Sequence, residues 1–142
     1  MLLISLIWWS NCGGQDQNDL QILRCVPIGE DGRKIDDDAE CPRYQATIIQ
    51  LLARPEIFDG KRVIVTGFLH VAFESRGLYI RRQDFDDRLW HNGLWLGTFS
   101  ESVNECQDDT YVTLEGLFQS RRYGHYGLWS GMITDITRCY TR

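Results

Sequence analysis

Short runs of apolar and β-branched residues, separated by turn-forming residues, fill the chain from about residue 60 onward. The alternation is clearest in 62–70, where the odd-numbered residues from Val63 to Leu69 are predicted to face one way and the even-numbered residues the other. Four later runs have similar length and composition. The pattern therefore predicts five strands, at 62–70, 78–82, 94–99, 111–118 and 126–139.

Two segments show helical spacing instead. Apolar residues recur every three or four positions over 44–53, and this helix is expected to stop at Arg54, because the residue before a proline avoids the helical conformation. Asp59-Gly60 is a strong turn dipeptide. A second short helix is predicted over 84–90, ended by Asn92-Gly93.

These elements predict a mainly β fold with one or two short helices. Five short strands, with glycines such as Gly67 and Gly116 placed to allow sharp bends, suit a small five-stranded antiparallel barrel of the OB-like type. An open antiparallel α+β sandwich is the alternative. We expect one OB-like β domain over residues 45–142, with no internal repeat.

The sequence predicts an export segment at the N-terminus. Residues 1–9 are almost wholly apolar, too short to span a membrane but suited to the apolar region of a signal. The run, followed by Cys12 and a polar stretch, resembles a bacterial lipoprotein signal, in which the cysteine is diacylated; Asn11 departs from the small residue usual before it. Residues 1–12 are thus expected to be an export signal with Cys12 as the lipid anchor, which places the protein in the periplasm, attached to a membrane. A buried strand or helix over 1–9 is the alternative.

Four cysteines remain beside Cys12, and two disulfides in an oxidising compartment are the simplest interpretation. None of the five forms a C-x-x-C motif, which disfavours zinc. If 110–120 and 126–138 form a hairpin, Cys106 and Cys139 are equidistant from a turn at Arg122-Tyr123, which favours a Cys106–Cys139 bond. Cys25–Cys41 follows by elimination. Reduced, buried cysteines remain the alternative.

Two stretches resemble bacterial cell-envelope proteins of OB-like type. The first runs from Pro55-Glu56 through 58–63 to 65–69, and the second is the strand YVTLEG at 111–116. The likeness spans about residues 48–138 and rests on strands and glycines. It implies a binding fold in the cell envelope and supplies no catalytic residue.

Charge is distributed unevenly. The chain has 15 basic and 20 acidic residues, a net charge of −5, and the excess is concentrated in 13–44, an expected acidic tether and loop. Its aspartates Asp36, Asp37 and Asp38 lack calcium-loop spacing and are expected to face a basic partner surface. An acidic, exported chain is not expected to bind nucleic acid.

No catalytic motif is present. The chain lacks a nucleophile elbow, a phosphate-binding loop and a paired-histidine zinc motif, and its three histidines are far apart in sequence. We therefore expect no enzyme activity, no metal and no cofactor. The residues typical of protein interfaces gather instead at one predicted turn, at Arg121, Arg122, Tyr123, His125 and Tyr126.

These features predict a non-enzymatic, envelope-tethered binding protein. Its small size and expected disulfides suit a stoichiometric inhibitor of a protein, such as an immunity protein that neutralises a secreted antibacterial toxin encoded nearby. Binding of a small ligand or glycan is the alternative, and binding of single-stranded nucleic acid is a third reading.

Overall fold

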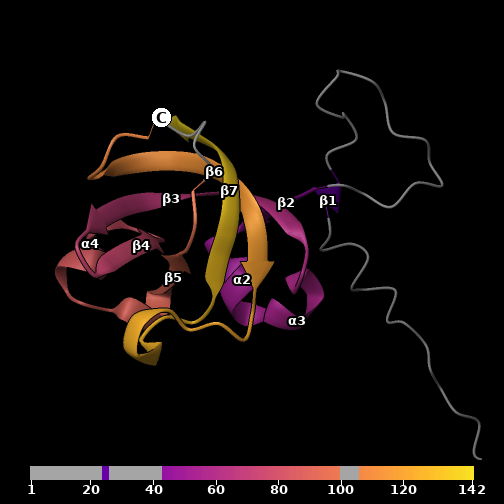
Figure 1. The fold of residues 1–142 in the computed structure, drawn as a ribbon, viewed down its shortest axis with the longest axis horizontal. Helices are drawn as coiled ribbons and strands as arrows, with labels where there is room; N and C mark the ends of the chain where they lie inside the picture. The colour runs from indigo at the N-terminus through magenta and orange to yellow at the C-terminus, as the bar shows by residue number, and fades with distance from the viewer. Residues whose placement is uncertain (1–23, 26–42, 100–105) are drawn as a thin grey trace, which may run out of the picture.

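The computed structural model describes residues 24–25, 43–99 and 106–142. Within these ranges short helices connect the strands of one sheet (Figure 1). The strands are β1 (Arg24–Cys25), β2 (Tyr44–Thr47), β3 (Arg62–Ala72), β4 (Ser75–Tyr79), β5 (Gly93–Leu96), β6 (Thr110–Gln119) and β7 (Met132–Thr141). The helices are α2 (Ile48–Ala53), α3 (Pro55–Phe58) and α4 (Arg82–Asp86), with 3-10 turns η1 (Trp90–Asn92) and η2 (His125–Gly127).

The sheet runs in the order β1-β2-β3-β4-β5-β7-β6, and β3 also pairs with β6. The pairings from β3 through β4, β5, β7 and β6 therefore return to β3. The long strand β3 makes this possible, since its first half pairs with β2 while its second half pairs with β4, and β6 follows it along Arg62–Leu69.

The prediction of five antiparallel strands is wrong in two respects. Beside the two-residue β1, the sheet has six strands, and β2–β3 and β5–β7 are parallel pairs. The extra strand, β2, occupies the first part of the segment expected to be helical. Thr47 explains the difference, because its hydroxyl accepts a hydrogen bond from the Gln50 N–H and caps the helix there, so that the preceding residues pair with β3 instead.

Other expectations are confirmed or shifted. The first helix does stop at Ala53, before Arg54 and Pro55, but a second short helix, α3, follows at once. The strand expected at 78–82 begins earlier, at Ser75, because β3 and β4 are joined by a two-residue turn. The helix expected over 84–90 is divided into α4 and η1, and the last strand starts at Met132.

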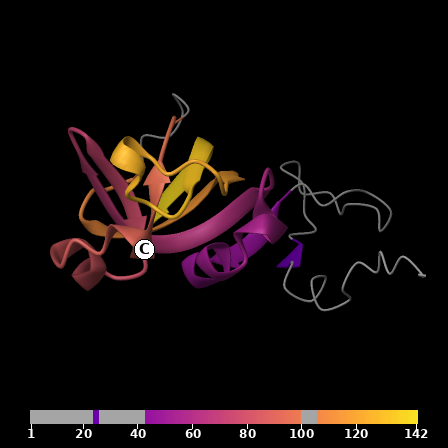
Figure 2. The same cartoon turned by 90° about the horizontal axis from the view of Figure 1, so that it is seen from below.

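The aliphatic core lies on the inner side of the sheet. Ile48 and Leu51 of α2 and Phe58 of α3 close one end of it. Figure 2 shows these helices at one end of β3 and the β3–β4 hairpin at the other. The strands contribute mainly branched residues, with Val63, Val65, Leu69, Leu78, Leu94, Leu96, Val112, Leu114, Ile133 and Ile136 all buried.

A disulfide joins Cys106 and Cys139, as expected, with Cα atoms 5.5 Å apart. The hairpin register used to predict it is wrong, since Leu114 lies opposite Cys139. Cys106 instead precedes β6, and it packs against the core that contains Cys139. The backbone of Cys25 lies in β1, whereas Cys12 and Cys41 lie outside the described residues, so the expected Cys25–Cys41 pair stays a prediction. In the described ranges no helix has the length and apolar character needed to cross a membrane.

Candidate functional site

The outer side of β3, β4 and β5 carries aromatic residues, and the strand register explains their arrangement. One row across the strands places Phe68 beside Tyr79, and Tyr79 beside Gly93. The next row places His70 beside Gly77, and Gly77 beside Trp95. Directly paired residues share a face of a sheet, so these rings and glycines lie together opposite the aliphatic core. We call this surface the outer face.

Tyr79 occupies the centre of the outer face and is fully buried. A Cβ atom at Gly77 would lie 2.5 Å from its ring, and one at Gly93 2.7 Å from it, so the ring needs glycine on both sides. The Trp129 indole N–H donates to the Tyr79 hydroxyl at 3.3 Å. Burial raises the pKa of Tyr79 above its ordinary value, while the hydrogen bond from Trp129 acts in the opposite direction.

Rings from the connecting segments cover this face. Phe85 of α4 stacks on His70 with ring centroids 3.9 Å apart, and Trp90 of η1 lies 6.3 Å from both Phe85 and Tyr79. Trp129 continues the layer, 5.8 Å from Trp90 and 4.6 Å from Trp95. The outer face is therefore a second, aromatic packing layer that ties three connecting segments to the sheet.

The β6–β7 loop, residues 120–131, is held against one end of this layer. At Gly124, where φ is +67°, a Cβ atom would lie 2.6 Å from the Trp95 side chain, so the loop backbone rests directly on that ring. The backbone N–H of Trp129 donates to the Tyr123 carbonyl at 3.1 Å, and the Ser130 hydroxyl donates to the His91 carbonyl at 2.8 Å. These hydrogen bonds and the contact with Trp95 therefore hold the loop in one conformation.

The start of the same loop is held by hydrogen bonds to a carboxylate. The Asp59 carboxylate accepts a 2.7 Å hydrogen bond from the Ser120 N–H. Hydrogen bonds from the Ser120 backbone and hydroxyl, with a smaller effect of the Arg121 charge, hold the pKa of Asp59 below its ordinary value. The loop is therefore anchored at both its beginning and its end.

From this fixed loop, large side chains project into solvent. Tyr126 is 82% exposed and Tyr123 50% exposed, while Arg121 and Arg122 are also exposed. His125 is only half-buried, because it lies between Trp95 and Tyr126. The structure thus brings together all five residues expected at this turn, Arg121, Arg122, Tyr123, His125 and Tyr126.

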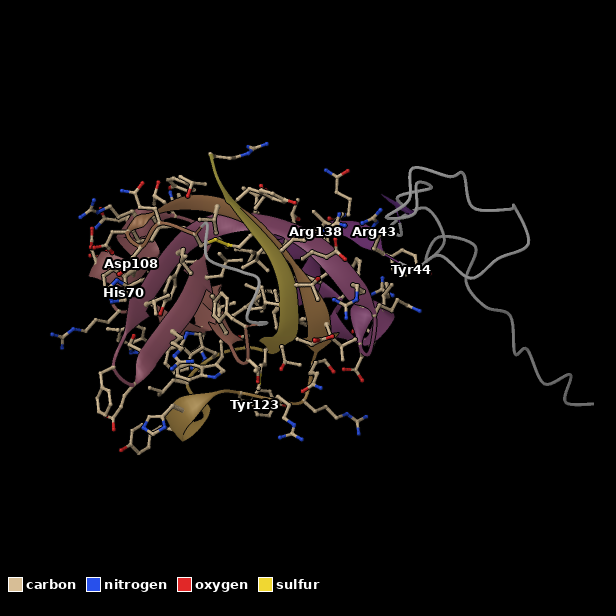
Figure 3. All side chains as sticks on the ribbon, turned by 45° about the horizontal axis from the view of Figure 1, so that its top comes forward. Arg43, Tyr44, His70, Asp108, Tyr123 and Arg138 are labelled. Atoms are coloured by element: carbon tan, nitrogen blue, oxygen red, sulfur yellow. A yellow bond between two sulfur atoms is a disulfide. The ribbon has the colours of Figure 1, made fainter. Side chains whose placement is uncertain are left out.

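One further residue of this region was missed from the sequence. Phe73, at the tip of the β3–β4 hairpin, is 92% exposed. Figures 2 and 3 place this hairpin and the η2 loop on the same side of the molecule. An aromatic residue next to Glu74 in a two-residue turn is the signal that could have identified it, because such a position has nothing to pack against. We call Phe73, Tyr123 and Tyr126, with Arg121 and Arg122, the exposed patch.

The charge of the described part differs from that of the whole chain. Residues 43–99 and 106–142 hold twelve Lys or Arg against ten Asp or Glu. The acidic balance therefore arises outside the described residues, where Asp36, Asp37, Asp38 and Cys12 also lie. The exposed patch carries two arginines, which favours a partner with carboxylates or aromatic rings.

A hollow of about 250 Å³ lies between Arg43, Glu115, Arg138 and Tyr140. Figure 3 shows Arg43 and Arg138 well away from Tyr123. A buried ion pair, with Arg43 Nη1 3.3 Å from Glu115 Oε2, ties the entry to β2 to the middle of β6. This ion pair stabilises the fold. Tyr140, which lies beside it, is an exposed tyrosine far from the exposed patch.

Comparison of the chain with protein-family models, with curated proteins and with solved structures found no match in any of the three.

Proposed function

We propose that the chain is an OB-like barrel protein that binds a protein partner through the exposed patch. The barrel part of the proposal rests on the circuit of pairings from β3 through β4, β5, β7 and β6 back to β3, with a short helix ahead of β3 and α4 between β4 and β5. In OB folds the loops flanking this sheet face are the usual binding elements, and the exposed patch lies on those loops.

The observation that carries the binding proposal is the exposure of large aromatic side chains on a backbone that is already ordered. Phe73 and Tyr126 are the most exposed large hydrophobic residues among those described. Water contact with such rings is unfavourable, so their exposure is typical of interaction sites. Because Trp95 and Trp129 fix the loop beforehand, a partner would gain the contact area of Tyr126 without the entropic cost of ordering the loop.

The nature of the partner follows from chemistry and compartment. Two arginines beside aromatic rings suit an acidic or aromatic protein surface. The Cys106–Cys139 disulfide supports an oxidising compartment, consistent with an exported protein tethered at Cys12. An immunity-type inhibitor that neutralises a secreted antibacterial toxin would have these features, and we propose that the chain is such an inhibitor.

The test is co-expression of the tagged full chain with the products of adjacent genes, followed by size-exclusion chromatography and calorimetry. We expect a one-to-one complex with one of these products. The double variant Phe73→Ala/Tyr126→Ala should weaken it at least a hundredfold, because loss of two hot-spot rings is worth several kcal/mol in a typical interface, about 2 kcal/mol or more each.

Tyr140→Ala is the control, since this tyrosine is also exposed, at 52%, but lies beside Arg43 and Arg138. It should leave the affinity unchanged. A complex that is equally weakened by Tyr140→Ala, or unaffected by the double variant, would contradict the assignment of the patch. Saturable binding of an oligosaccharide on the outer face, with no protein complex formed, would favour the ligand-binding alternative.

A further inference from the structure

His70, Asp108 and Asp109 form a cluster at the end of β3 that the aromatic layer does not explain. In the sequence the histidine is 38 residues from the nearer aspartate. The antiparallel pairing of β3 with β6 brings them together, because its last pair, Leu69 with Thr110, places His70 next to Asp109. Figure 3 shows His70 and Asp108 side by side.

The ligand atoms of these three residues all lie within 4.8 Å of one another. His70 Nδ1 and Asp109 Oδ1 are 2.8 Å apart, which is a hydrogen-bond contact. Two neighbouring ligands that each bind an ion at roughly 2.0–2.2 Å lie about 3–3.5 Å apart, so a small separation of these two side chains would admit the ion. We propose that His70, Asp108 and Asp109 bind a divalent first-row transition-metal ion such as Zn²⁺.

Two of the three side chains, those of His70 and Asp108, are oriented by a neighbour. The ring of Phe85 stacks on the His70 imidazole and limits its rotation. Asp108 Oδ1 accepts hydrogen bonds from the Val71 N–H at 2.7 Å and from the Asp109 N–H at 2.8 Å, which fixes that carboxylate. Ligands held in place by such contacts bind metal more tightly than freely rotating ones.

The donor set decides the class of ion. One imidazole nitrogen with two carboxylate oxygens suits Zn²⁺ and its neighbours, whereas Ca²⁺ prefers six or more oxygen ligands. Three protein ligands leave at least one coordination position open. Asp109 is 57% exposed, so that position is accessible.

The test is a titration of the full chain with ZnCl₂ by calorimetry, after treatment with a chelator and removal of any polyhistidine tag. We expect one equivalent to bind with micromolar affinity and to raise the melting temperature. Asp109→Asn, which keeps the size of an exposed side chain, and His70→Gln should each weaken binding at least tenfold. His91→Gln changes an exposed histidine outside the cluster and should leave the affinity unchanged.

A second readout reports the location of the ion. Co²⁺ in place of Zn²⁺ should give visible absorption bands and quench tryptophan fluorescence, because Phe85 lies between His70 and Trp90. Both signals should be lost in Asp109→Asn. The proposal is overturned if zinc leaves the melting temperature of the wild-type chain unchanged while Asp109→Asn lowers it without metal, since the cluster is then only a structural hydrogen bond. It is also overturned if zinc binds equally well to the His70 and Asp109 variants.

Discussion

The two sides of the sheet are packed with different kinds of side chain, aliphatic on the inner side and aromatic on the outer face. The inner side is filled mainly with branched aliphatic residues, whose side chains carry no polar atom. The outer face is filled with rings, several of which carry a polar atom, and the β6–β7 loop packs against one end of it. Aliphatic packing depends on volume alone, whereas the aromatic layer also fixes directions, through the Trp129–Tyr79 hydrogen bond and the contact of Trp95 with Gly124. The inner side therefore maintains the fold, and the outer face positions the β6–β7 loop.

The largest expected effect tests the inner side. Phe118 is fully buried in the aliphatic core, and Phe118→Ala should lower the free energy of unfolding by about 3–5 kcal/mol, because it removes buried area and leaves a cavity. Urea denaturation followed by circular dichroism measures the change. Tyr126→Ala, which removes an exposed ring, should change the free energy by less than about 0.5 kcal/mol. Similar losses of unfolding free energy in the two variants would show that the packing of Phe118 in the core does not account for this stability.

The next effect concerns the crosslink that closes the inner side. Replacing both cysteines, Cys106→Ala/Cys139→Ala, should cost about 2–4 kcal/mol, because the unfolded chain is no longer closed across a sequence separation of 33 residues. Urea denaturation of this variant, compared with the wild-type chain without reductant, gives the value. A variant as stable as the wild type would mean that strain in the folded state cancels the restriction of the unfolded chain.

A glycine pair tests whether the outer face holds the loop. Gly124 and Gly127 both have positive φ, but only at Gly124 would a Cβ atom meet Trp95. Gly127→Ala should cost about 1–2 kcal/mol for the left-handed conformation alone. Gly124→Ala should cost at least about 1 kcal/mol more, because its φ of 67° and ψ of −158° form a conformation essentially restricted to glycine and because the Trp95 ring must also move, and it should weaken partner binding. Equal losses in the two variants would contradict the contact between the loop and the aromatic layer.

The smallest effect concerns the polar atoms of the outer face. Tyr79→Phe removes the acceptor of the Trp129 N–H and leaves that buried donor unpaired, so we expect a loss of about 1 kcal/mol. Thermal denaturation at neutral pH measures it. Tyr140→Phe, at an exposed tyrosine, is the control and should have no effect.

The same variant gives a pH signature. Burial raises the pKa of Tyr79 in the folded chain above the ordinary value of 10.0. The folded state therefore binds this proton more tightly than the unfolded state does, and the contribution is complete below pH 10 and is lost as the pH rises above it. The free energy of unfolding should fall less steeply between pH 9 and roughly pH 11 in Tyr79→Phe than in the wild type. Parallel curves would contradict the burial of this hydroxyl.

Local signals in the sequence located most elements. Alternation identified β3, the turn dipeptide at Asp59-Gly60 ended the helical region, and Pro55 ended α2. Alternation cannot show which strands become neighbours across long connections, so the parallel pair β5–β7 was missed. The Cys106–Cys139 bond was predicted from a hairpin register that the structure does not have. The bond forms nevertheless, because Cys106 lies ahead of β6 and packs against the core that contains Cys139.

The arginines and tyrosines of the 121–126 turn could be located from the sequence, since they cluster there within a few positions. By itself the sequence thus determined the mainly β character of the chain, the turn residues and the arginine- and tyrosine-rich character of this turn, because these depend on neighbours along the chain. The tertiary structure alone decided that Trp95 supports Gly124, that the β3–β4 hairpin lies on the same side as the η2 loop, and that His70 meets Asp109. Those contacts join residues that are far apart in sequence, and they exist only once the register between strands is set.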